Sequence, residues 1–216
     1  MEEAPRDHYN MDRYFTDLAT AFVRGRLGSE TATVEEGLAA GLRLHKFKQN
    51  TELPRVKRVL GILRGMAPEN LLDIGSGRGT FLWPLLANFP ELLVTAIDAN
   101  ERRASDLAAV RDGGVERLTV ARMDAQNLAY PPKCFDVVTM LEVLEHLQNP
   151  AAALRCVVQA ARRCIIVSIP SVPDENPEHI HLFSVEQLRD MAVTAGCTRV
   201  SIEHVLNHRI MIGQTS

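Results

Sequence analysis

The stretch that decides the fold is residues 71–81, Leu-Leu-Asp-Ile-Gly-Ser-Gly-Arg-Gly-Thr-Phe. It begins with a short apolar run, which predicts a buried strand, and one acid, Asp73, interrupts that run near its end. Residues 81–89 then predict a helix, and the turn before it carries glycines at alternate positions: Gly75, Gly77 and Gly79. Glycine lets the backbone turn sharply and approach a ligand closely, and the helix N-terminus leaves N–H groups free. The pattern therefore predicts the nucleotide-binding corner of a doubly wound α/β sheet.

The spacing of the glycines narrows the choice of ligand. It is G-x-G-x-G rather than the G-x-G-x-x-G of dinucleotide-binding proteins, and Asp73 lies shortly before the first glycine. A carboxylate at this place would repel a pyrophosphate and attract a cationic or amino-bearing ligand. The motif resembles motif I of the class I S-adenosylmethionine (SAM) methyltransferases. Taken alone, it leaves open an ordinary glycine turn in another α/β protein.

Composition indicates one globular domain. The chain has 216 residues, of which 46% are hydrophobic and 24% charged, and its net charge of −3 gives no general attraction to nucleic acid. No apolar run approaches the roughly 20 residues of a membrane span, and the first residues do not resemble a signal peptide. The scattered cysteines, without a C-x-x-C pair, indicate reduced thiols. We expect a cytoplasmic monomer or homodimer that binds neither DNA nor membrane.

The residues before the first strand predict helices. The spacing of Tyr14, Leu18, Phe22 and Val23 predicts the apolar face of a first helix. Gly25 and Gly28 are expected to end that helix. Thr33 and Glu36 form a capping-box pattern for a second helix that reaches about Phe47. A third helix is expected over residues 52–65, with Thr51 as its N-cap.

We divide the chain into an N-terminal helical cap, residues 1–50, and a domain, residues 51–216. If the domain binds SAM, we expect the first two helices to cover the ligand and the third to pack on the sheet. One acid, Glu52, stands in this region among seven basic residues: Arg43, Lys46, Lys48, Arg55, Lys57, Arg58 and Arg64. They form either a patch for phosphates or the solvated face of two helices. We favour the solvated face, because no aromatic residues for base stacking accompany the charges.

Downstream, strands and helices alternate. Strands are expected at 92–97, 118–121, 135–141 and 164–169, helices at 101–111, 150–160 and 184–195, and two last strands at 199–205 and 209–213. The resemblance implies a Rossmann-like, doubly wound, seven-stranded α/β sheet whose last hairpin is antiparallel. It covers about residues 52–216.

Acids mark the ends of the second and third expected strands. Asp98 lies about 20 residues past the glycines, where an acid can accept hydrogen bonds from both ribose hydroxyls of a nucleotide; the alternative is an ordinary turn aspartate. By resemblance, Asp124 binds the adenine amino group and Met123 packs on the ring. The resemblance implies that SAM, and its product S-adenosylhomocysteine (SAH), are held by Asp73, Gly75, Ser76, Gly77, Asp98, Ala99, Met123, Asp124, Ala125 and Leu141.

The segment after the fourth strand carries an E-x-x-E-H pattern. If it begins a helix, Glu142, Glu145 and His146 lie on one face at spacings of three and four, where two carboxylates and an imidazole can hold a divalent metal. His179 and His181 alternate in the loop after the fifth strand, so either histidine can face the pocket.

E-x-x-E-H followed by H-x-F resembles the small-RNA 3′-terminal 2′-O-methyltransferases, in which two Glu and two His hold magnesium or manganese at the terminal hydroxyls. That resemblance implies a metal site made of Glu142, Glu145, His146 and His181. The first part also resembles the ubiquinone-biosynthesis O-methyltransferases, which act on catechol-like rings. The chain departs from the RNA family in its short loop before His181 and in the missing aromatic residue after H-x-F. In a generic small-molecule methyltransferase the same residues bind no metal.

We therefore predict a SAM-dependent methyltransferase that acts on an oxygen of a small-molecule acceptor. The candidate catalytic residues are Glu142, His146 and His181. Either histidine can serve as general base near neutral pH, unless a metal lowers the pKa of the acceptor hydroxyl. Two alternatives stay open: a metal-dependent methyltransferase of RNA 3′ ends, and a non-catalytic SAM-binding partner subunit.

Overall fold

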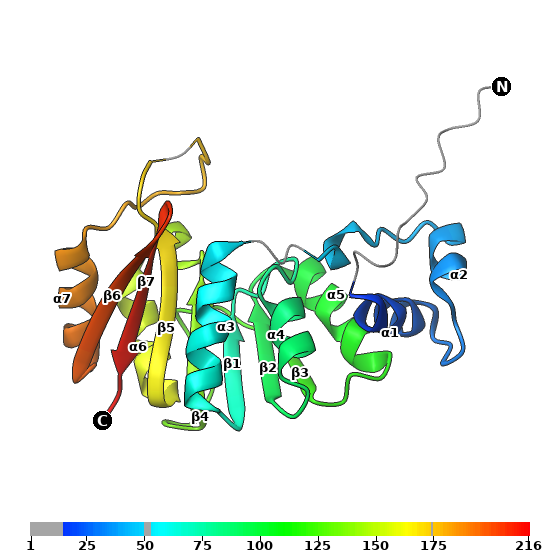
Figure 1. Cartoon of the computed structure of the whole chain (residues 1–216), viewed down its shortest axis with the longest axis horizontal. Coiled ribbons are helices and arrows are strands. Elements are labelled where there is room, and N and C mark those ends of the chain that lie inside the picture. Colours follow the sequence, from blue (N-terminus) through cyan, green and yellow to red (C-terminus); the bar gives the residue numbers. More distant parts are fainter. Residues whose placement is uncertain (1–14, 50–52, 174) are drawn as a thin grey trace.

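The computed structural model describes residues 15–49, 53–173 and 175–216. The predictions made for Tyr14, Thr51 and Glu52 lie outside the described residues. Within them, a seven-stranded sheet has the strand order β3-β2-β1-β4-β5-β7-β6 (Figure 1). Its strands are β1 (Asn70–Ile74), β2 (Leu93–Asp98), β3 (Leu118–Arg122), β4 (Phe135–Leu141), β5 (Ala161–Pro170), β6 (Arg199–Val205) and β7 (His208–Gln214).

The pairing of the strands confirms the predicted fold class. Strands β1 to β5 pair in parallel, whereas β7 is antiparallel to both β5 and β6. The sheet is therefore a Rossmann-like α/β sheet whose last hairpin is antiparallel. Because β1 lies between β2 and β4, the strand order reverses at β1, and in such sheets ligands bind at the carboxyl ends of the strands beside this point.

The helices are α1 (Thr16–Leu27), α2 (Val34–Ala39), α3 (Pro54–Met66), α4 (Leu82–Asn88), α5 (Glu101–Asp112), α6 (Pro150–Ala160) and α7 (Val185–Ala195), with short 3₁₀ helices η2 (His45–Phe47) and η3 (Leu144–His146). Two clusters of buried apolar side chains cover the two faces of the sheet. Along β4, Val137 belongs to one cluster, and Val138 and Met140 belong to the other. None of the helices in the described part of the chain combines the length and apolar character needed to cross a bilayer.

The second helix is shorter than predicted. Its capping box is present, since the Glu36 N–H donates to Thr33 Oγ1 at 3.2 Å and the Thr33 N–H donates to the Glu36 carboxylate at 2.8 Å. The helix nevertheless ends at Ala39 and does not reach Phe47. Gly41 follows with a φ of 81°, a left-handed conformation that stops a right-handed helix, and the chain coils again only in η2.

Helix α1 packs along α5, beside the β3 edge of the sheet (Figure 1). Two glycines make this close approach possible. A Cβ at Gly25 would lie 1.9 Å from the Ala109 carbonyl oxygen, and one at Gly113 would lie 1.7 Å from the Ala21 carbonyl oxygen. Residues 15–49 contribute no side chain to the lining of the cleft at the carboxyl ends of β1, β2 and β4. The expected cover over the ligand and the domain boundary near residue 50 stay predictions.

Candidate functional site

A cleft of about 820 Å³ opens at the carboxyl ends of β1, β2 and β4, where the strand order reverses. We call it the strand-end cleft. Every residue that the sequence predicts for the cofactor lines it: Asp73, Gly75, Ser76, Gly77, Asp98, Ala99, Met123, Asp124, Ala125 and Leu141. The fold thus brings the predicted residues together, and their contact with a cofactor stays a prediction.

The glycine turn needs glycine for two different reasons. Gly75, Gly77 and Gly79 all have left-handed backbones, with φ of 69°, 59° and 83°. In addition, a Cβ at Gly75 would lie 2.4 Å from Cγ2 of Val143, so the residue that follows Glu142 occupies the space that a side chain would need. The segment after β4 is therefore packed directly on the glycine turn.

Asp73 is a buried carboxyl group beneath the turn. Ser76 Oγ donates to it at 2.6 Å and Thr139 Oγ1 donates at 2.8 Å. Burial, with a smaller contribution from the negative charge of Asp98, raises the pKa of Asp73 to about 6, although both hydroxyl donors act in the opposite direction. A cationic group in the strand-end cleft would therefore favour the ionised form of a carboxyl that titrates close to neutral pH.

Asp98 connects the end of β2 to the glycine turn. Its Oδ2 accepts a hydrogen bond from the Gly77 N–H at 2.9 Å, and its Oδ1 accepts one from the Asn100 N–H at 2.8 Å. Each carboxylate oxygen can accept about one further hydrogen bond, so the carboxylate can still receive two hydroxyl groups from a ligand.

The end of β3 forms the far wall. The Met123 N–H donates to the Asp98 carbonyl oxygen at 3.2 Å, and the Met123 sulfur accepts a hydrogen bond from the Ala129 N–H at 3.4 Å. Asp124 Oδ1 accepts a hydrogen bond from the Gln126 N–H at 2.8 Å, and its side chain stays at the lining of the cleft. A thioether side chain and a carboxylate that line the same wall suit a flat heteroaromatic ring that bears an amino group.

The predicted helical face after β4 is wrong. Glu142 has a φ of 56°, and the chain then forms only the single 3₁₀ turn η3. The backbone reversal at Glu142 directs its carboxylate away from η3. Oε1 accepts a hydrogen bond from Ser168 Oγ at 2.6 Å, and Oε2 lies 3.2 Å from His208 Nε2. Arg55 Nε lies 3.8 Å from Oε1.

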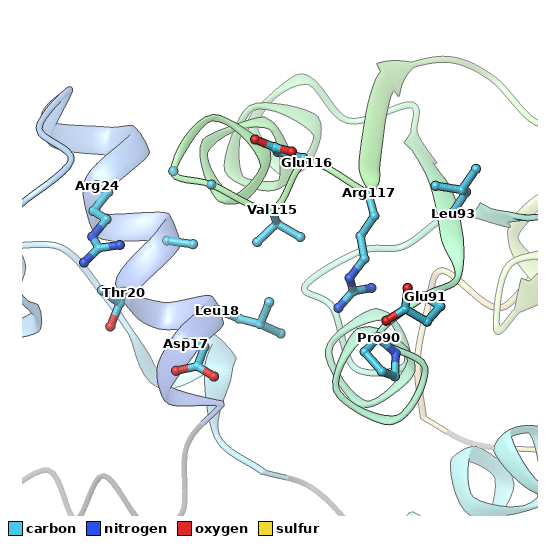
Figure 2. Close-up of a pocket in the computed structure, with 13 residues that line it drawn as sticks. Asp17, Leu18, Thr20, Arg24, Pro90, Glu91, Leu93, Val115, Glu116 and Arg117 are labelled. Carbon is cyan, nitrogen blue, oxygen red and sulfur yellow. The ribbon is translucent and has the colours of Figure 1, made fainter.

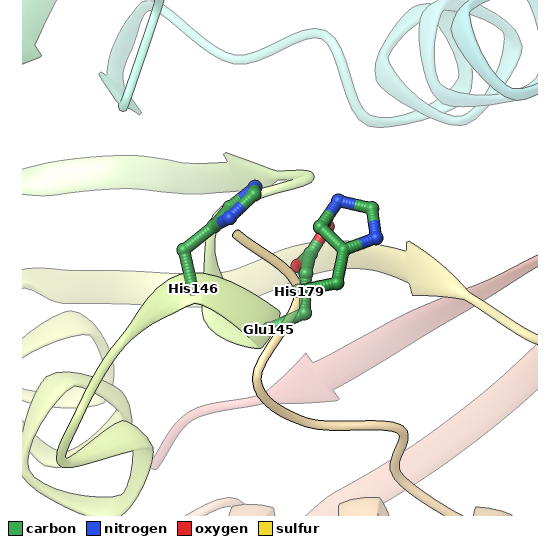
Figure 3. A group of neighbouring side chains, drawn as sticks. All are labelled: Glu145, His146 and His179. Carbon is green, nitrogen blue, oxygen red and sulfur yellow. The ribbon is translucent and has the colours of Figure 1, made fainter. Parts of the chain in front are cut away.

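A different set of side chains comes together instead. One ligand atom from each of Glu145, His146 and His179 lies within 4.8 Å of the others. Figure 3 shows the three neighbouring side chains. We call these residues the Glu-His-His group. Glu145 is fully buried, and its carbonyl oxygen accepts hydrogen bonds from the Ile180 and His181 N–H groups, at 3.0 and 3.2 Å, which fix the loop that carries His179. His146 Nδ1 lies 2.9 Å from the Glu178 carbonyl oxygen, an arrangement that orients the ring.

His181 lies apart from this group. Its Nε2 is 3.0 Å from the Leu147 carbonyl oxygen, and its ring faces Phe183, with the ring centroids 5.1 Å apart. The four ligands implied by resemblance are therefore divided in the structure. Glu145 and His146 stay together, whereas Glu142 and His181 point elsewhere and His179 completes the group.

Four residues at the site were not predicted as site residues from the sequence: Arg55, Ser168, Glu178 and His208. Arg55 belonged to the basic stretch, and its place at the cleft results from the packing of α3. Ser168 reaches Glu142 because β5 pairs parallel with β4, and His208 reaches it because β7 pairs antiparallel with β5. No local pattern in the sequence reports such a contact.

Most of the described charges in the basic stretch already have partners. Arg58 forms two hydrogen bonds with Glu203, at 2.6 and 2.7 Å, and Lys46 is bonded to Asp106 on α5. Arg64 donates to Asn88 Oδ1 at 2.5 Å. These contacts support the interpretation that the charges hold helices in place rather than forming a site for phosphates.

A second cleft, of about 910 Å³, lies between α1 and the turns that precede β2 and β3 (Figure 2). We call it the α1 cleft. Its lining combines apolar residues such as Leu18 and Val115 with charges of both signs, Arg24 and Arg117 against Asp17, Glu91 and Glu116. None of the 13 described residues that line it was predicted as a site residue.

The fold and the strand-end cleft together define the class I SAM-dependent methyltransferase architecture, and comparison with known proteins agrees. A family model described as a methyltransferase domain matches residues 45–202. The chain is 37% identical over 110 residues to 27-O-demethylrifamycin SV methyltransferase of Amycolatopsis mediterranei (strain S699); this match covers 49% of the chain and 38% of that protein.

Solved structures show the same fold. The N-terminal domain of EvdMO1 with SAH bound has a TM-score of 0.66 at 15% identity, over 88% of this chain and 100% of that chain. Magnesium protoporphyrin IX methyltransferase (ChlM) of Synechocystis PCC 6803 with bound SAH has a TM-score of 0.61 at 18% identity, over 75% and 82%. Because the family model covers more than half of the sequence, the chain belongs to the methyltransferase domain family.

Proposed function

We propose that this protein transfers the methyl group of SAM to an oxygen of a small-molecule acceptor. The observation that carries the proposal is that two kinds of residue line the same cleft. Gly75 and Asp98, which are predicted to bind the cofactor, share a cleft of about 820 Å³ with Glu142 and His146, which are candidate catalytic residues. A methyl donor and an acceptor that occupy this cleft together would be in contact.

The donor side fits SAM in its chemistry. The left-handed glycine backbones leave room for a close ligand, Asp98 keeps acceptor capacity for two hydroxyls, and Asp73 offers a carboxyl group to a cation. When bound, SAM supplies a methyl group already activated on a sulfonium sulfur. The protein is then left to hold the acceptor in line and to remove its proton.

The names of two relatives support a small-molecule acceptor. The Amycolatopsis protein is named for 27-O-demethylrifamycin SV, and the Synechocystis protein for magnesium protoporphyrin IX. An RNA acceptor stays a prediction, since the partners of Arg58, Lys46 and Arg64 leave fewer cations for phosphates. A non-catalytic partner role stays a prediction as well.

We further propose that the Glu-His-His group holds a divalent ion. A buried carboxylate with two imidazoles is a donor set that suits manganese, iron or zinc as well as magnesium. The carbonyl oxygen of Glu178, bound to His146 Nδ1, is the kind of outer contact that orients a metal-binding histidine. Such an ion would bind and orient adjacent acceptor oxygens, as a catechol presents.

The test is methyl transfer from labelled SAM to a panel of catechol, protocatechuate and a hydroxynaphthoquinone, with manganese, with magnesium and with EDTA. We expect label in at least one acceptor, and activity that EDTA removes. His146→Gln and His179→Gln should each lower kcat about a hundredfold or more while the Kd of SAH stays unchanged.

The matched control is His181→Gln, the same change at a histidine outside the Glu-His-His group, with an expected change in kcat below about threefold. Full activity in EDTA would exclude the metal and leave the methyl transfer itself intact. Absence of label from every acceptor would contradict the proposed activity.

A further inference from the structure

The residue that follows β4 has an unusual backbone. Glu142 adopts a φ of 56°, a left-handed conformation that disfavours a residue with a side chain. Two contacts hold it there. The Glu142 N–H donates to the Ser168 carbonyl oxygen at 2.9 Å, and the next residue, Val143, fills the space above Gly75. Strained residues that are fixed from both sides are frequent at functional sites.

Three side chains from three elements surround the Glu142 carboxylate. Ser168 of β5 donates to Oε1 at 2.6 Å, and His208, the first residue of β7, places Nε2 3.2 Å from Oε2. Arg55 of α3 brings a second charged group to this carboxylate, with its Nε 3.8 Å from Oε1. The position of Glu142 is therefore set by the sheet and by α3 rather than by its own loop.

Only part of this network reaches the cleft. Glu142 and Arg55 line the strand-end cleft, whereas Ser168 and His208 lie behind Glu142 and outside the lining. A carboxylate has about four directions in which it accepts hydrogen bonds. Its contacts with Ser168 and His208 leave acceptor capacity for a hydroxyl group in the cleft. In this network, the contact of His208 with the cleft runs through Glu142.

We propose that Glu142 accepts the proton of the acceptor hydroxyl and that His208 is the positioning residue that holds its carboxylate. This inference rests on the proposed function. The acceptor oxygen bonds to the methyl carbon as the bond from that carbon to sulfur breaks, with its electron pair left on sulfur. The O–H bond breaks, and the proton goes to Glu142 and then to water. The positive charge lost from sulfur equals that of the proton released, so no further reactant is needed.

Two other roles would use the same contacts. The network could serve only to hold the β6–β7 hairpin against β5, or Glu142 could bind the cofactor instead of the acceptor. A purely structural role predicts lower thermal stability with unchanged kcat. A cofactor role predicts a weaker Kd for SAH. Proton transfer to Glu142 predicts a fall in kcat with KM and the Kd of SAH unchanged.

The experiment compares Glu142→Gln, His208→Ala and His208→Gln with the wild type, using whichever of catechol, protocatechuate and hydroxynaphthoquinone the wild type methylates fastest. We expect kcat to fall about a hundredfold or more in Glu142→Gln and about tenfold in His208→Ala. His208→Gln should recover most of that loss, because its amide N–H can donate to the carboxylate. KM and the Kd of SAH should stay within about twofold.

The matched control is His204→Gln, the same change at an exposed position of β6 in the same hairpin, which should leave kcat unchanged. Wild-type kcat in His208→Ala would overturn the inference, and so would a Kd of SAH that weakens in step with kcat. No methyl transfer by the wild type is a separate result: it would overturn the proposed function first, and the proton transfer with it.

Discussion

The strand-end cleft and the α1 cleft differ in position more than in size. Their volumes are about 820 and 910 Å³, and the larger one lies where β2 and β3 begin rather than where strands end. Parallel strands direct their carboxyl ends, and the loops that follow, toward one edge of the sheet. Volume therefore does not single out the candidate site in this fold, whereas the reversal of strand order at β1 does.

The two clefts also differ in how their charges and backbones are held. The strand-end cleft contains the buried carboxyl groups of Asp73 and Asp98 and a left-handed non-glycine residue, Glu142. In the α1 cleft, the acids Asp17 and Glu116 are exposed. Buried charge and backbone strain reduce stability unless other contacts offset them, so their concentration in one cleft indicates where function is located.

The largest expected effect is a loss of SAH affinity, and it is tested by substituting one glycine from each cleft. Gly75→Ala adds a Cβ at a left-handed residue where it would lie 2.4 Å from Val143, so the glycine turn must shift. Gly114→Ala in the α1 cleft adds a Cβ at a φ of 114° with no atom within 4 Å. We expect SAH binding, measured by calorimetry, to weaken about a hundredfold or more in Gly75→Ala and less than about threefold in Gly114→Ala.

Both substitutions strain a backbone with positive φ, but only Gly75 lines the strand-end cleft. Gly114→Ala therefore shows how much of the lost SAH affinity results from backbone strain alone. Equal weakening of SAH binding in the two variants would show that the comparison between the clefts is wrong.

A smaller loss of SAH affinity is expected from Asp98→Asn in the strand-end cleft. Asp98→Asn replaces one acceptor oxygen by an amide that faces the N–H of Gly77 or Asn100, which loosens the turn and removes an acceptor for the ligand. Hydrogen bonds to a charged group contribute about 1.5–3 kcal/mol, so the Kd of SAH should rise about tenfold to a hundredfold. Glu91→Gln in the α1 cleft is the control and should leave Kd within about twofold. An unchanged Kd in Asp98→Asn would remove Asp98 from the ligand site.

The third expected effect is a dependence of the SAM affinity on pH. Burial raises the pKa of Asp73 to about 6, so the carboxyl is largely protonated below that pH. A cationic ligand favours the ionised form, and binding at lower pH must release this proton. The affinity for SAM should therefore rise severalfold from about pH 5 to pH 6 and level off above about pH 7. Asp73→Asn should show no such rise in calorimetric titrations across this range, and a rise that persists in the variant would assign it to another group.

The smallest effect on ligand binding is expected in the α1 cleft itself. Arg117 donates to the carbonyl oxygens of Leu86 and Phe89 at the end of α4, at 2.7 and 3.3 Å. Arg117→Gln should lower the free energy of unfolding by about 1 kcal/mol and leave the Kd of SAH within about twofold. Thermal unfolding and calorimetry on the same sample check both values, and a large loss of SAH affinity would extend the ligand site to this cleft.

Much of the fold could be predicted because its signals are local. Asn149 and Pro150 begin α6 and Gly196 ends α7, so these helices have their predicted limits. The cofactor side follows from one strand, one glycine turn and one helix that adjoin in sequence, together with residues at the ends of the later strands, such as Asp98 and Asp124. The second helix was predicted too long, because its capping box marks where the helix begins, whereas its end depends on the left-handed backbone of Gly41.

The acceptor side could not be predicted in the same way, because it forms between distant segments. A helical spacing was assumed for Glu142, Glu145 and His146, but Val143 must fit against Gly75, and the backbone therefore reverses at Glu142. Likewise, alternation in an extended loop could not choose between His179 and His181. The choice depends on two N–H groups that bond to the Glu145 carbonyl oxygen, a contact across more than thirty residues of sequence.

The most direct test of the central claim is a crystal structure of the protein grown with SAH. The account predicts electron density for the ligand in the strand-end cleft, with its ribose at Asp98, its adenine between Met123 and Asp124, and its amino-acid part beside Gly75 and Asp73. Density for SAH in the α1 cleft, or a strand-end cleft that stays empty at saturating SAH, would contradict it.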